Sequence, residues 1–314
     1  MIGSVLVTGG SGYLGSHISK LLYRNHWNIH ILDLEQPKHN YYNRYYWSDI
    51  RDRTSVRKIF EENQYDYVIH LASRIEVGES MKHPTEFWDV NVGGTVNILN
   101  AIKNYGNSKL LFSSTAGLYW PSKNPLKEED CRVENSVYSN TKVACESAIR
   151  DSGIDHMIFR YFNLAGADPE CDIGESHEPE THLIPNIFRK LNNFTLYGND
   201  YDTADGTCVR DYVHVCDVAD AHLNAIKYLN SGRPSEIVNL GSGKGHSILQ
   251  VIQTFEDLYT IKVHCHFGSR RSGDPDSLVA DISRARNLLN YSPKHDLKSI
   301  IKTAYEWHKK IDRT

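Results

Sequence analysis

The chain has 314 residues, which is enough for one large α/β domain with an added lobe, or for two modest domains, and in either case for a sizeable core. Its 35 Lys and Arg residues stand against 39 Asp and Glu, so no strong electrostatic field points to a nucleic-acid partner. The first apolar run, Ile2 to Val7, leads directly into glycines, and no apolar run approaches the roughly 18 residues of a membrane span. We therefore expect neither a secretory signal nor a membrane-spanning helix.

The six cysteines are scattered, without a Cys-x-x-Cys pair or a zinc-like spacing. They are Cys131, Cys145, Cys171, Cys208, Cys216 and Cys265. No metal-ligand spacing links the sixteen histidines either, and His182 and His214 are assigned no chemistry. We expect reduced thiols, a cytoplasmic protein and no metal site.

Short aliphatic runs alternate with longer amphipathic segments through the first half of the chain. The predicted strands are Val5–Val7, Ile29–Leu32, Tyr67–Leu71, Lys109–Phe112 and His156–Phe159. The predicted helices, with apolar residues three and four apart, are Tyr13–Asn25, Thr54–Asn63, Pro84–Asn104 and Val137–Asp151. This alternation predicts the α/β class, with a Rossmann-type doubly wound parallel sheet.

After about Asn163 the chain changes character, with loops rich in Asp, Gly, Pro and His between shorter elements. We expect a Rossmann domain at 1–163 and a smaller C-terminal substrate-binding lobe at 164–314. The boundary is not sharp, because the sequence again predicts a helix at 211–228 and a strand at 235–239. We expect the segment 211–240 to return to the Rossmann layer.

A glycine-rich turn lies between the first predicted strand and the first predicted helix. It reads Thr8-Gly9-Gly10-Ser11-Gly12-Tyr13-Leu14-Gly15. Glycines in this context let the backbone approach a pyrophosphate, whose charge is met by free N–H groups and the positive helix end. The alternative is a glycine turn without a ligand. The context favours a dinucleotide cofactor held by Gly9, Gly12, Tyr13, Leu14 and Gly15.

Two acidic positions follow at strand ends. Asp33, after Ile29–Leu32, is placed to accept hydrogen bonds from the adenosine ribose, although it could instead cap a local turn. A carboxylate there would repel a 2′-phosphate, so we predict NAD rather than NADP. Asp49 and Ile50 end another short run, where a carboxylate could meet the adenine amino group.

Tyr138 and Lys142 lie four residues apart on a predicted helix, which puts phenol and ammonium on one face. A tyrosine is a poor base near neutral pH unless cations stabilise its phenolate, and Lys142 with a nicotinamide ring would do so. Alone, such a pair is often a surface coincidence. Here Ser113, Ser114 and Thr115 end a strand at the edge where ligands bind, and the Thr115 hydroxyl could hold the substrate oxygen.

These residues resemble the extended short-chain dehydrogenases/reductases and, within them, the UDP-galactose 4-epimerases. The resemblance covers nearly the whole chain. Beyond the residues above, it rests on His70-Leu71-Ala72, Val77-Gly78-Glu79-Ser80, Asn91-Val92-Gly93-Gly94-Thr95, Arg160-Tyr161-Phe162-Asn163, His182-Leu183-Ile184-Pro185, Gly198-Asn199-Asp200-Tyr201 and Val209-Arg210-Asp211-Tyr212-Val213-His214.

The resemblance implies further contacts. Residues implied at the cofactor are Leu71, Ala72, Ser73, Asn91, Ser113 and Phe162, with Tyr138 and Lys142. Residues implied at a UDP-sugar are Thr115, Asn163, Leu183, Tyr197, Arg210, Arg271, Asp274 and Leu278. The two arginines would hold the diphosphate bidentately, and Asp274 would accept from the uridine ribose. For Arg210 with Asp211, the alternative is a surface ion pair.

The sequence departs from the family in three places. Arg74-Ile75-Glu76 stands where the epimerases often carry a lysine for the cofactor, a contact that Arg74 could replace. Thr115 stands where many have serine, and both carry the needed hydroxyl. Leu278 lies near the sugar pocket, where a branched side chain argues against an N-acetyl group.

The activity implied is interconversion of UDP-galactose and UDP-glucose. Tyr138 would take the proton of the sugar 4-hydroxyl while C4 passes hydride to tightly bound NAD; the 4-keto sugar would then turn and take hydride on its other face. Alternatives are a 4-epimerase of UDP-N-acetylhexosamines or UDP-pentoses, a nucleotide-sugar dehydratase, and a non-catalytic NAD or UDP-sugar sensor. A dehydratase would carry an acid pair after Thr115, where Ala116-Gly117 stands. The family further implies a homodimer built on the helices Pro84–Asn104 and Val137–Asp151.

Overall fold

The structure is a computed structural model. It describes residues 2–130, 136–176, 180–271 and 274–312, so Cys131 lies outside the described residues. The chain divides into two compact units, each built from several stretches of sequence. The first comprises Met1–Leu118, Cys131–Arg160 and Ala219–Val238, and the second comprises Tyr119–Asp130, Tyr161–Val218 and Asn239–Thr314. The sequence predicts domains at 1–163 and 164–314, with 211–240 rejoining the first layer; in the structure Ala219–Val238 belongs to the first unit and Tyr119–Asp130 to the second.

A seven-stranded sheet forms the centre of the first unit, in the order β10-β6-β5-β4-β1-β2-β3. Its strands are β1 (Ser4–Thr8), β2 (Asn28–Asp33), β3 (Arg44–Trp47), β4 (Tyr67–His70), β5 (Lys109–Thr115), β6 (His156–Tyr161) and β10 (Glu236–Leu240). The pairs β1–β2, β1–β4, β2–β3 and β4–β5 are parallel. The carboxyl ends of these parallel strands therefore share one edge, where ligands bind in open α/β sheets.

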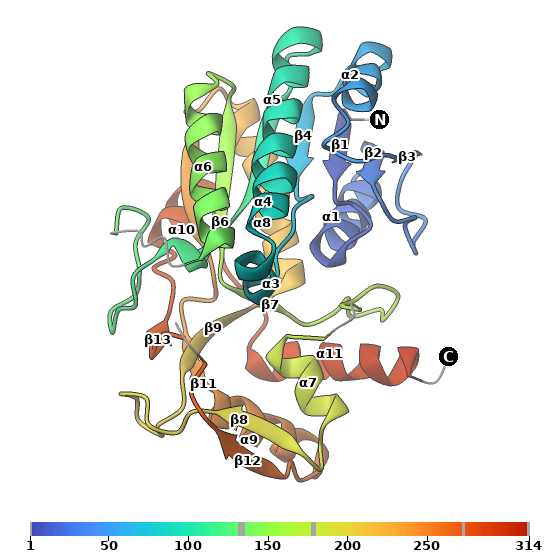
Figure 1. Ribbon diagram of the computed structural model, residues 1–314. Coiled ribbons are helices and arrows are strands. Elements are labelled where there is room, and N and C mark those ends of the chain that lie inside the picture. Colours follow the sequence, from blue (N-terminus) through green and yellow to red (C-terminus); the bar gives the residue numbers. More distant parts are fainter. Residues whose placement is uncertain (1, 131–135, 177–179, 272–273, 313–314) are drawn as a thin grey trace. The chain divides into compact units, whose positions relative to one another are not determined.

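Helices connect the strands and cover the sheet. They are α1 (Tyr13–Arg24), α2 (Arg53–Glu62), α5 (Gly94–Tyr105), α6 (Val137–Asp151) and α8 (Val215–Asn230). Figure 1 shows α5 and α6 side by side in front of the sheet, with α1 and α8 behind it. Side-chain caps fix where two of them begin, because Asp52 accepts from Thr54 N at the start of α2 and Ser136 accepts from Ser139 N at the start of α6.

The predicted strands and helices of the first half are confirmed, with one difference between Pro84 and Asn104. That stretch is three segments: α4 (Pro84–Phe87), a π-helical turn η1 (Trp88–Gly93) and α5. Shorter helical turns α3 (Val77–Lys82) and η2 (Ala116–Leu118) complete the unit. A π turn accommodates one extra residue and redirects its side chains, which apolar periodicity alone does not reveal.

The apolar faces of β1, β4, β5 and β6 pack against α2, α5 and α6 to form the core of the first unit. Leu6, Val68, Leu110 and Ile158 contribute from the strands, and Ile98 from α5. All five side chains are fully buried. A continuous buried run of this kind is expected for parallel strands covered on both faces.

The second unit contains smaller sheets. One has the order β11-β9-β13, with β7 also paired to β9, and the other pairs β8 with β12. The strands are β7 (Asn163–Ala165), β8 (Phe194–Tyr197), β9 (Val209–His214), β11 (Gly245–Ser247), β12 (Cys265–Gly268) and β13 (Ser277–Leu278). The helices are α7 (Leu183–Arg189), α9 (Ile248–Tyr259), α10 (Ser283–Leu289) and α11 (Leu297–Ile311). Apolar residues of α7, α9 and α11 pack together around Phe255.

The expectation of a helix over 211–228 is wrong for its first four residues. Asp211–His214 belongs to strand β9, which pairs with β7, β11 and β13, and α8 begins only at Val215. Five of the six side chains of β9 are buried, which suits a strand held by partners that are distant in sequence. The predicted strand at 235–239 is confirmed as β10, beside β6 in the large sheet. Among the described residues, no helix has both the length and the apolar character needed to cross a membrane.

Candidate active site

The glycine turn is closely packed against the chain that follows β4. Gly9 has φ +73°, and a Cβ atom on it would come within 2.7 Å of the Ala72 backbone nitrogen. On Gly15 a Cβ atom would lie 2.2 Å from the Gly9 oxygen. Glycine is therefore required at both positions by the fold itself.

Gly12 is different, because a Cβ atom there would meet only the Gly9 oxygen, at 3.4 Å. Gly12 is the N-cap of α1 and provides no side-chain hydrogen bond to the first turn. The space before the helix is thus a cradle that a side chain would fill, next to backbone N–H groups and the positive helix end. The residues present fit the pyrophosphate of a dinucleotide, with Tyr13 and Leu14 in the first turn.

Asp33 joins the glycine turn to the end of β2. Its carboxylate accepts from Ser11 N at 2.9 Å and from Glu35 N at 3.1 Å. The alternative role as a local cap is therefore observed, and the same bonds hold the carboxylate beside the glycine turn. This is where an adenosine ribose would lie if the cradle holds a pyrophosphate.

Asp49 and Ile50 are less accessible than the sequence suggested. Asp49 receives two nitrogens of the Arg51 guanidinium, at 2.7 and 3.0 Å to its Oδ2 atom, and Arg51 lowers the pKa of this carboxyl. Ile50 is buried, and a Cβ atom on Gly94 would collide with its Cδ1 atom at 2.3 Å. Ile50 therefore packs under α5, as part of the core that supports the site.

Lys142 lies beneath the strand end that carries Thr115. Its side chain is buried, and Nζ donates to the Ser113 carbonyl at 2.8 Å and to Ser73 Oγ at 3.2 Å. The same Nζ is 5.8 Å from the centre of the Tyr138 ring. The predicted pair thus lies on one face of α6, with two predicted cofactor residues, Ser73 and Ser113, bound directly to the ammonium.

Burial dominates the proton equilibria of this pair. It raises the pKa of Tyr138 to about 12, against which a hydrogen bond with Thr115 acts to lower it. Burial likewise lowers the pKa of Lys142 to about 8, opposed by the nearby Cys145 and Glu146. A phenol in this setting becomes a base only when positive charge reaches it, which is what a bound nicotinamide ring and the Lys142 ammonium supply.

Leu71 and Ala72 follow β4 and bond to the first strand, because both backbone N–H groups donate to the Thr8 carbonyl, at 3.0 and 3.1 Å. Asn91, also predicted at the cofactor, is buried in η1. Its Oδ1 accepts from Arg74 N at 2.8 Å, and its Nδ2 donates to Thr141 Oγ1 at 3.0 Å. The structure therefore gives Asn91 the task of fastening the chain after β4 to α6.

Arg74, which could replace the absent lysine, has two partners in the helical region that follows β4. Its guanidinium pairs with Glu86 of α4 and lies 5.1 Å from the centre of the Phe87 ring. The positive charge of Arg74 is therefore paired within this helical region.

The predicted diphosphate residues gather in the second unit. Arg210 Nη2 lies 2.6 Å from Asp274 Oδ1, and the Arg271 guanidinium lies 4.4 Å from the centre of the Tyr197 ring. Leu278 of β13 is paired in register with Arg210 of β9. Asp274 N donates to the Arg271 carbonyl at 3.2 Å, so residues from three separate stretches of the sequence form a connected set with two guanidinium groups.

The alternative of a surface ion pair between Arg210 and Asp211 is wrong. Both side chains are buried, and Asp211 accepts from Ser242 N at 2.7 Å and from Ala280 N at 3.1 Å. Asp211 is thus a structural anchor for two loops, and burial raises the pKa of its carboxyl.

The remaining predicted residues of this unit occupy element ends. Asn163 is exposed at the start of β7, opposite Tyr212 of β9. Leu183 is the first residue of α7 and packs against the core of this unit. Phe162 is buried, and its ring is stacked on that of Tyr119, with the centres 6.2 Å apart.

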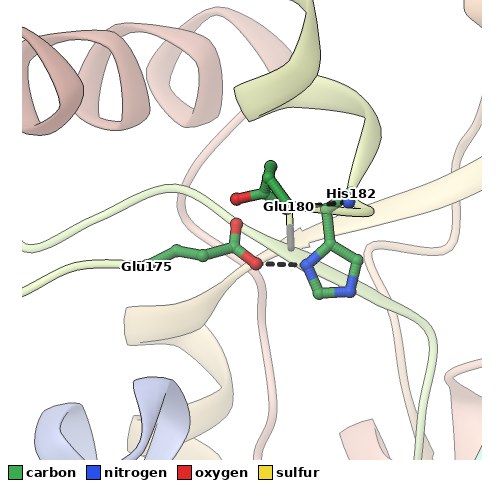
Figure 2. A group of neighbouring side chains, drawn as sticks. All are labelled: Glu175, Glu180 and His182. Atoms are coloured by element: carbon green, nitrogen blue, oxygen red, sulfur yellow. Dashed lines mark hydrogen bonds and ion pairs between the residues drawn. The ribbon is translucent and has the colours of Figure 1, made fainter. Parts of the chain in front are cut away.

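A group of three side chains that the sequence did not single out lies before α7 (Figure 2). Glu175 pairs with His182, and Glu180 Oε1 accepts from His182 N at 2.8 Å. Ligand atoms of the three lie within 4.8 Å of one another. Both carboxylates act here on the residue that precedes α7, so the group fixes where the helix carrying Leu183 begins.

Sequence reasoning also missed Glu146, which lies on the same helix as Tyr138. Its carboxylate accepts from Ser114 Oγ at 2.6 Å and from Arg160 Nη2 at 2.8 Å. Glu146 stands four residues after Lys142, a spacing that could have placed it on the same helical face.

The fold and the residues described so far define a class of protein: a Rossmann-type α/β protein with a dinucleotide cradle and a Tyr–Lys pair at the carboxyl edge of its sheet. Comparison with protein-family models gives a match to the NAD dependent epimerase/dehydratase family over residues 5–241. That match spans most of the chain, and the protein belongs to this family.

Several named proteins are similar to this chain over nearly its full length. A UDP-glucose 4-epimerase of Lactobacillus helveticus is 40% identical, over 97% of each chain. Among solved structures, a UDP-glucose 4-epimerase from Stenotrophomonas maltophila with bound NAD and formylated UDP-arabinopyranose superposes with a TM-score of 0.94, at 34% identity and 99% coverage of each chain. The UDP-Glc/GlcNAc 4-epimerase of Campylobacter jejuni gives a TM-score of 0.83 at 32% identity, with 98% of this chain and 99% of that chain covered.

Proposed function

We propose that this protein is an isomerase that interconverts UDP-galactose and UDP-glucose by inversion at C4, with tightly bound NAD. The observation that carries the proposal is the arrangement of Thr115, Tyr138 and Lys142 at the strand edge that also holds the glycine cradle. The names of relatives that match the chain from end to end support the choice of reaction.

The protein's own groups have distinct tasks in this reaction. When bound, NAD supplies the acceptor and later the donor of a hydride. The Tyr138 phenolate removes the proton of the sugar 4-hydroxyl, while Thr115 holds that oxygen by a hydrogen bond. Lys142, fastened to Ser113 and Ser73, keeps a positive charge beneath the phenol. The product of the first half-reaction is a 4-keto sugar, to which Tyr138 returns the proton after the sugar has turned.

The second unit supplies the nucleotide contacts in this proposal. Arg210 and Arg271 bind the diphosphate oxygens, and Asp274 accepts from the uridine ribose while it orients Arg210. The remaining substrate contacts that we propose are Asn163, Leu183, Tyr197 and Leu278. Firm binding of UDP lets the keto sugar rotate without leaving, because the affinity resides in the part of the substrate that does not react.

A 4-epimerase of another UDP-sugar is the second candidate. The Stenotrophomonas maltophila relative holds a formylated UDP-arabinopyranose, and the Campylobacter jejuni relative is named for both UDP-Glc and GlcNAc. Leu278 favours the smaller hexoses over N-acetylhexosamines. A dehydratase is disfavoured because Ala116 and Gly117 follow Thr115, and a silent sensor is disfavoured because Tyr138 and Lys142 are both in place.

One assay tests the proposal. Purified protein, with no NAD added, is incubated separately with UDP-galactose, UDP-N-acetylgalactosamine and UDP-xylose, and the released sugars are identified. We expect UDP-glucose from UDP-galactose. Preference for one of the other two substrates would select the second candidate, and conversion of none of the three would refute the epimerase assignment.

We propose further that two copies of the chain associate. Apolar side chains that a monomer would leave in water lie on neighbouring segments of the first unit: Val77 and Met81 of α3, Trp88 of η1 and Val96 of α5. Light scattering should give the mass of a dimer, and Met81→Lys with Val96→Lys should give the mass of a monomer. The reduced thiols of the described cysteines agree with a cytoplasmic location, which remains part of the proposal.

A further inference from the structure

Three successive residues of β5 are bound by three residues of α6 that are spaced four apart. Ser113 accepts from Lys142, Ser114 donates to Glu146, and Thr115 is hydrogen-bonded to Tyr138. Residues 138, 142 and 146 form one stripe along the helix, since i and i+4 lie one above the other. The strand end that presents Thr115 is therefore held along two turns of the helix that presents Tyr138.

Glu146 is the innermost member of the stripe, and Arg160 of β6 neutralises it. Both side chains are buried, with 0% exposure for Glu146 and 3% for Arg160. The guanidinium donates from Nη2 at 2.8 Å to Oε2 and from Nε at 3.0 Å to Oε1, which also receives the Ser114 hydroxyl. Two-point geometry of this kind allows little freedom for the carboxylate, and it compensates the cost of burying the charge.

The same carboxylate contributes to the charge environment of Lys142. From its own helix the ammonium is faced by Tyr138, Cys145 and Glu146. From the neighbouring strands it is faced by the Phe112 ring, with its centre at 5.0 Å, and by His70 of β4. Cys145 and Glu146 act to raise the pKa of Lys142 against the stronger effect of burial, and of these two Glu146 is the group that is ion-paired, with Arg160.

We propose that Glu146, held by Arg160, is a positioning residue of the proton-transfer site: it locks the end of β5 onto α6, so that Thr115 and Lys142 keep their places around the Tyr138 hydroxyl. The inference rests on the proposed proton transfer at Tyr138. It assigns to the buried pair a task in the chemistry beyond its contribution to the fold.

The test compares Glu146→Gln with a matched variant elsewhere. Glu146→Gln keeps the size of the side chain and removes its charge. Asp217→Asn is the control, because Asp217 is also a buried carboxylate that accepts from backbone N–H groups and a histidine, but in the second unit. If Glu146→Gln does not fold with Arg160 left unpaired, the double variant Glu146→Gln with Arg160→Gln removes both charges together and replaces it.

We expect the Glu146 variant to lower kcat by roughly 10- to 100-fold with KM within about twofold, because a loosened Thr115 and Lys142 affect the reacting atoms and not the nucleotide contacts. The decline of kcat on the alkaline side should also begin at a lower pH, since the Lys142 ammonium loses a neighbouring anion. Asp217→Asn should lower the melting temperature with kcat and its pH profile unchanged. A Glu146 variant that loses only melting temperature, with wild-type kcat and pH profile, overturns the proposal.

A measurement without substrate separates this inference from the proposed function. The tyrosinate absorbance of the NAD-loaded protein is titrated with base, and the curve of Tyr138→Phe is subtracted to isolate Tyr138. In the Glu146 variant the Tyr138 titration should move to higher pH, because the phenolate loses the Thr115 bond and the adjacent ammonium. If no UDP-sugar is converted, this shift still supports the positioning role. An unchanged titration overturns it whatever the substrate proves to be.

Discussion

The Nδ1 atom of His70 lies 2.6 Å from the hydroxyl oxygen of Thr8, and its Nε2 atom lies 3.0 Å from that of Thr95. The imidazole thus joins the end of β1, just before the glycine turn, to the first turn of α5. Both ring nitrogens are used and the ring is buried, and burial disfavours the charged form of the histidine.

His70 should make the fold sensitive to acid. Burial, with the Lys142 charge as a second cause, lowers the pKa of His70 to about 3. Between that value and the ordinary value of 6.5 the unfolded chain binds a proton that the folded chain does not, so stability falls as pH drops through this range. Between pH 7 and pH 5 the loss from this one site is about 2 kcal/mol.

The measurement is the free energy of unfolding in urea at the two pH values. His70→Gln lacks the titrating group, so it should be less stable than wild type at pH 7 yet lose less on going to pH 5. His83→Gln, at an exposed position, should follow the wild type. Equal losses in His70→Gln and wild type would rule out this origin of acid sensitivity.

The glycine cradle predicts opposite effects for two neighbouring substitutions. Gly12→Ala places its Cβ atom 3.4 Å from the Gly9 oxygen, an ordinary van der Waals contact, and should leave the free energy of unfolding within about 0.5 kcal/mol of wild type. The same methyl group intrudes where a pyrophosphate would bind, so NAD affinity should fall by about tenfold or more. Gly15→Ala collides with the Gly9 backbone and should destabilise the fold by roughly 2 kcal/mol.

Calorimetry of NAD binding, together with urea unfolding, checks both halves of this prediction. Gly78→Ala is the control, since a Cβ atom there has nothing within 4 Å. If Gly12→Ala binds NAD with wild-type affinity, the glycine cradle is not part of the cofactor site.

Tyr138→Phe should remove the base while keeping the ring. We expect kcat to fall by about 10²- to 10⁴-fold, the usual contribution of a positioned acid–base group. NAD content after purification should stay at the wild-type level. Tyr119→Phe is the matched control, because it removes a hydroxyl that donates to Asn239 Oδ1 at 2.6 Å in the second unit. Its effect should appear in the melting temperature, and retention of turnover by Tyr138→Phe would assign the base elsewhere.

Arg210→Met should weaken the binding of the UDP-sugar. Loss of a charge-assisted contact to the diphosphate should raise KM by roughly 10- to 100-fold with a smaller change in kcat. The comparison is Arg270→Met: like Arg210, Arg270 pairs with an aspartate, Asp200, but its side chain is 40% exposed, against 10% for Arg210. Steady-state kinetics with UDP-galactose should separate the two, and equal KM values would argue against Arg210 as a diphosphate ligand.

The parts of this protein that sequence predicts are those set by local patterns. Buried aliphatic runs identify β1, β2, β4, β5 and β6, and the turn between Thr8 and Gly15 follows from its glycines. The Tyr138–Lys142 face follows from helical spacing alone. These features depend on residues within one or two turns of each other, so no knowledge of the fold is needed to locate them.

The parts that sequence misses depend on contacts between distant segments. Asp211–His214 becomes a strand because β7, β11 and β13 offer it partners, which overrides its resemblance to a helix start. Arg210 and Asp274 are 64 positions apart when they pair. Glutamate and arginine are residue types usually found on the surface. Only the packing of α6 on β5 and β6 makes Glu146 and Arg160 a buried pair.

The order of the strands has a consequence for how the chain is made. Strand β6 pairs with β10, but the residues Tyr161–Val218, which belong to the second unit, lie between them in sequence. During synthesis β6 therefore emerges with one open edge, and that edge is closed only after much of the second unit has left the ribosome. An open strand edge is a template for aggregation. A chain cut after residue 163 would lack Ala219–Val238, so it would not contain the whole first unit. Folding of the first unit is therefore completed only after these later residues have been synthesised.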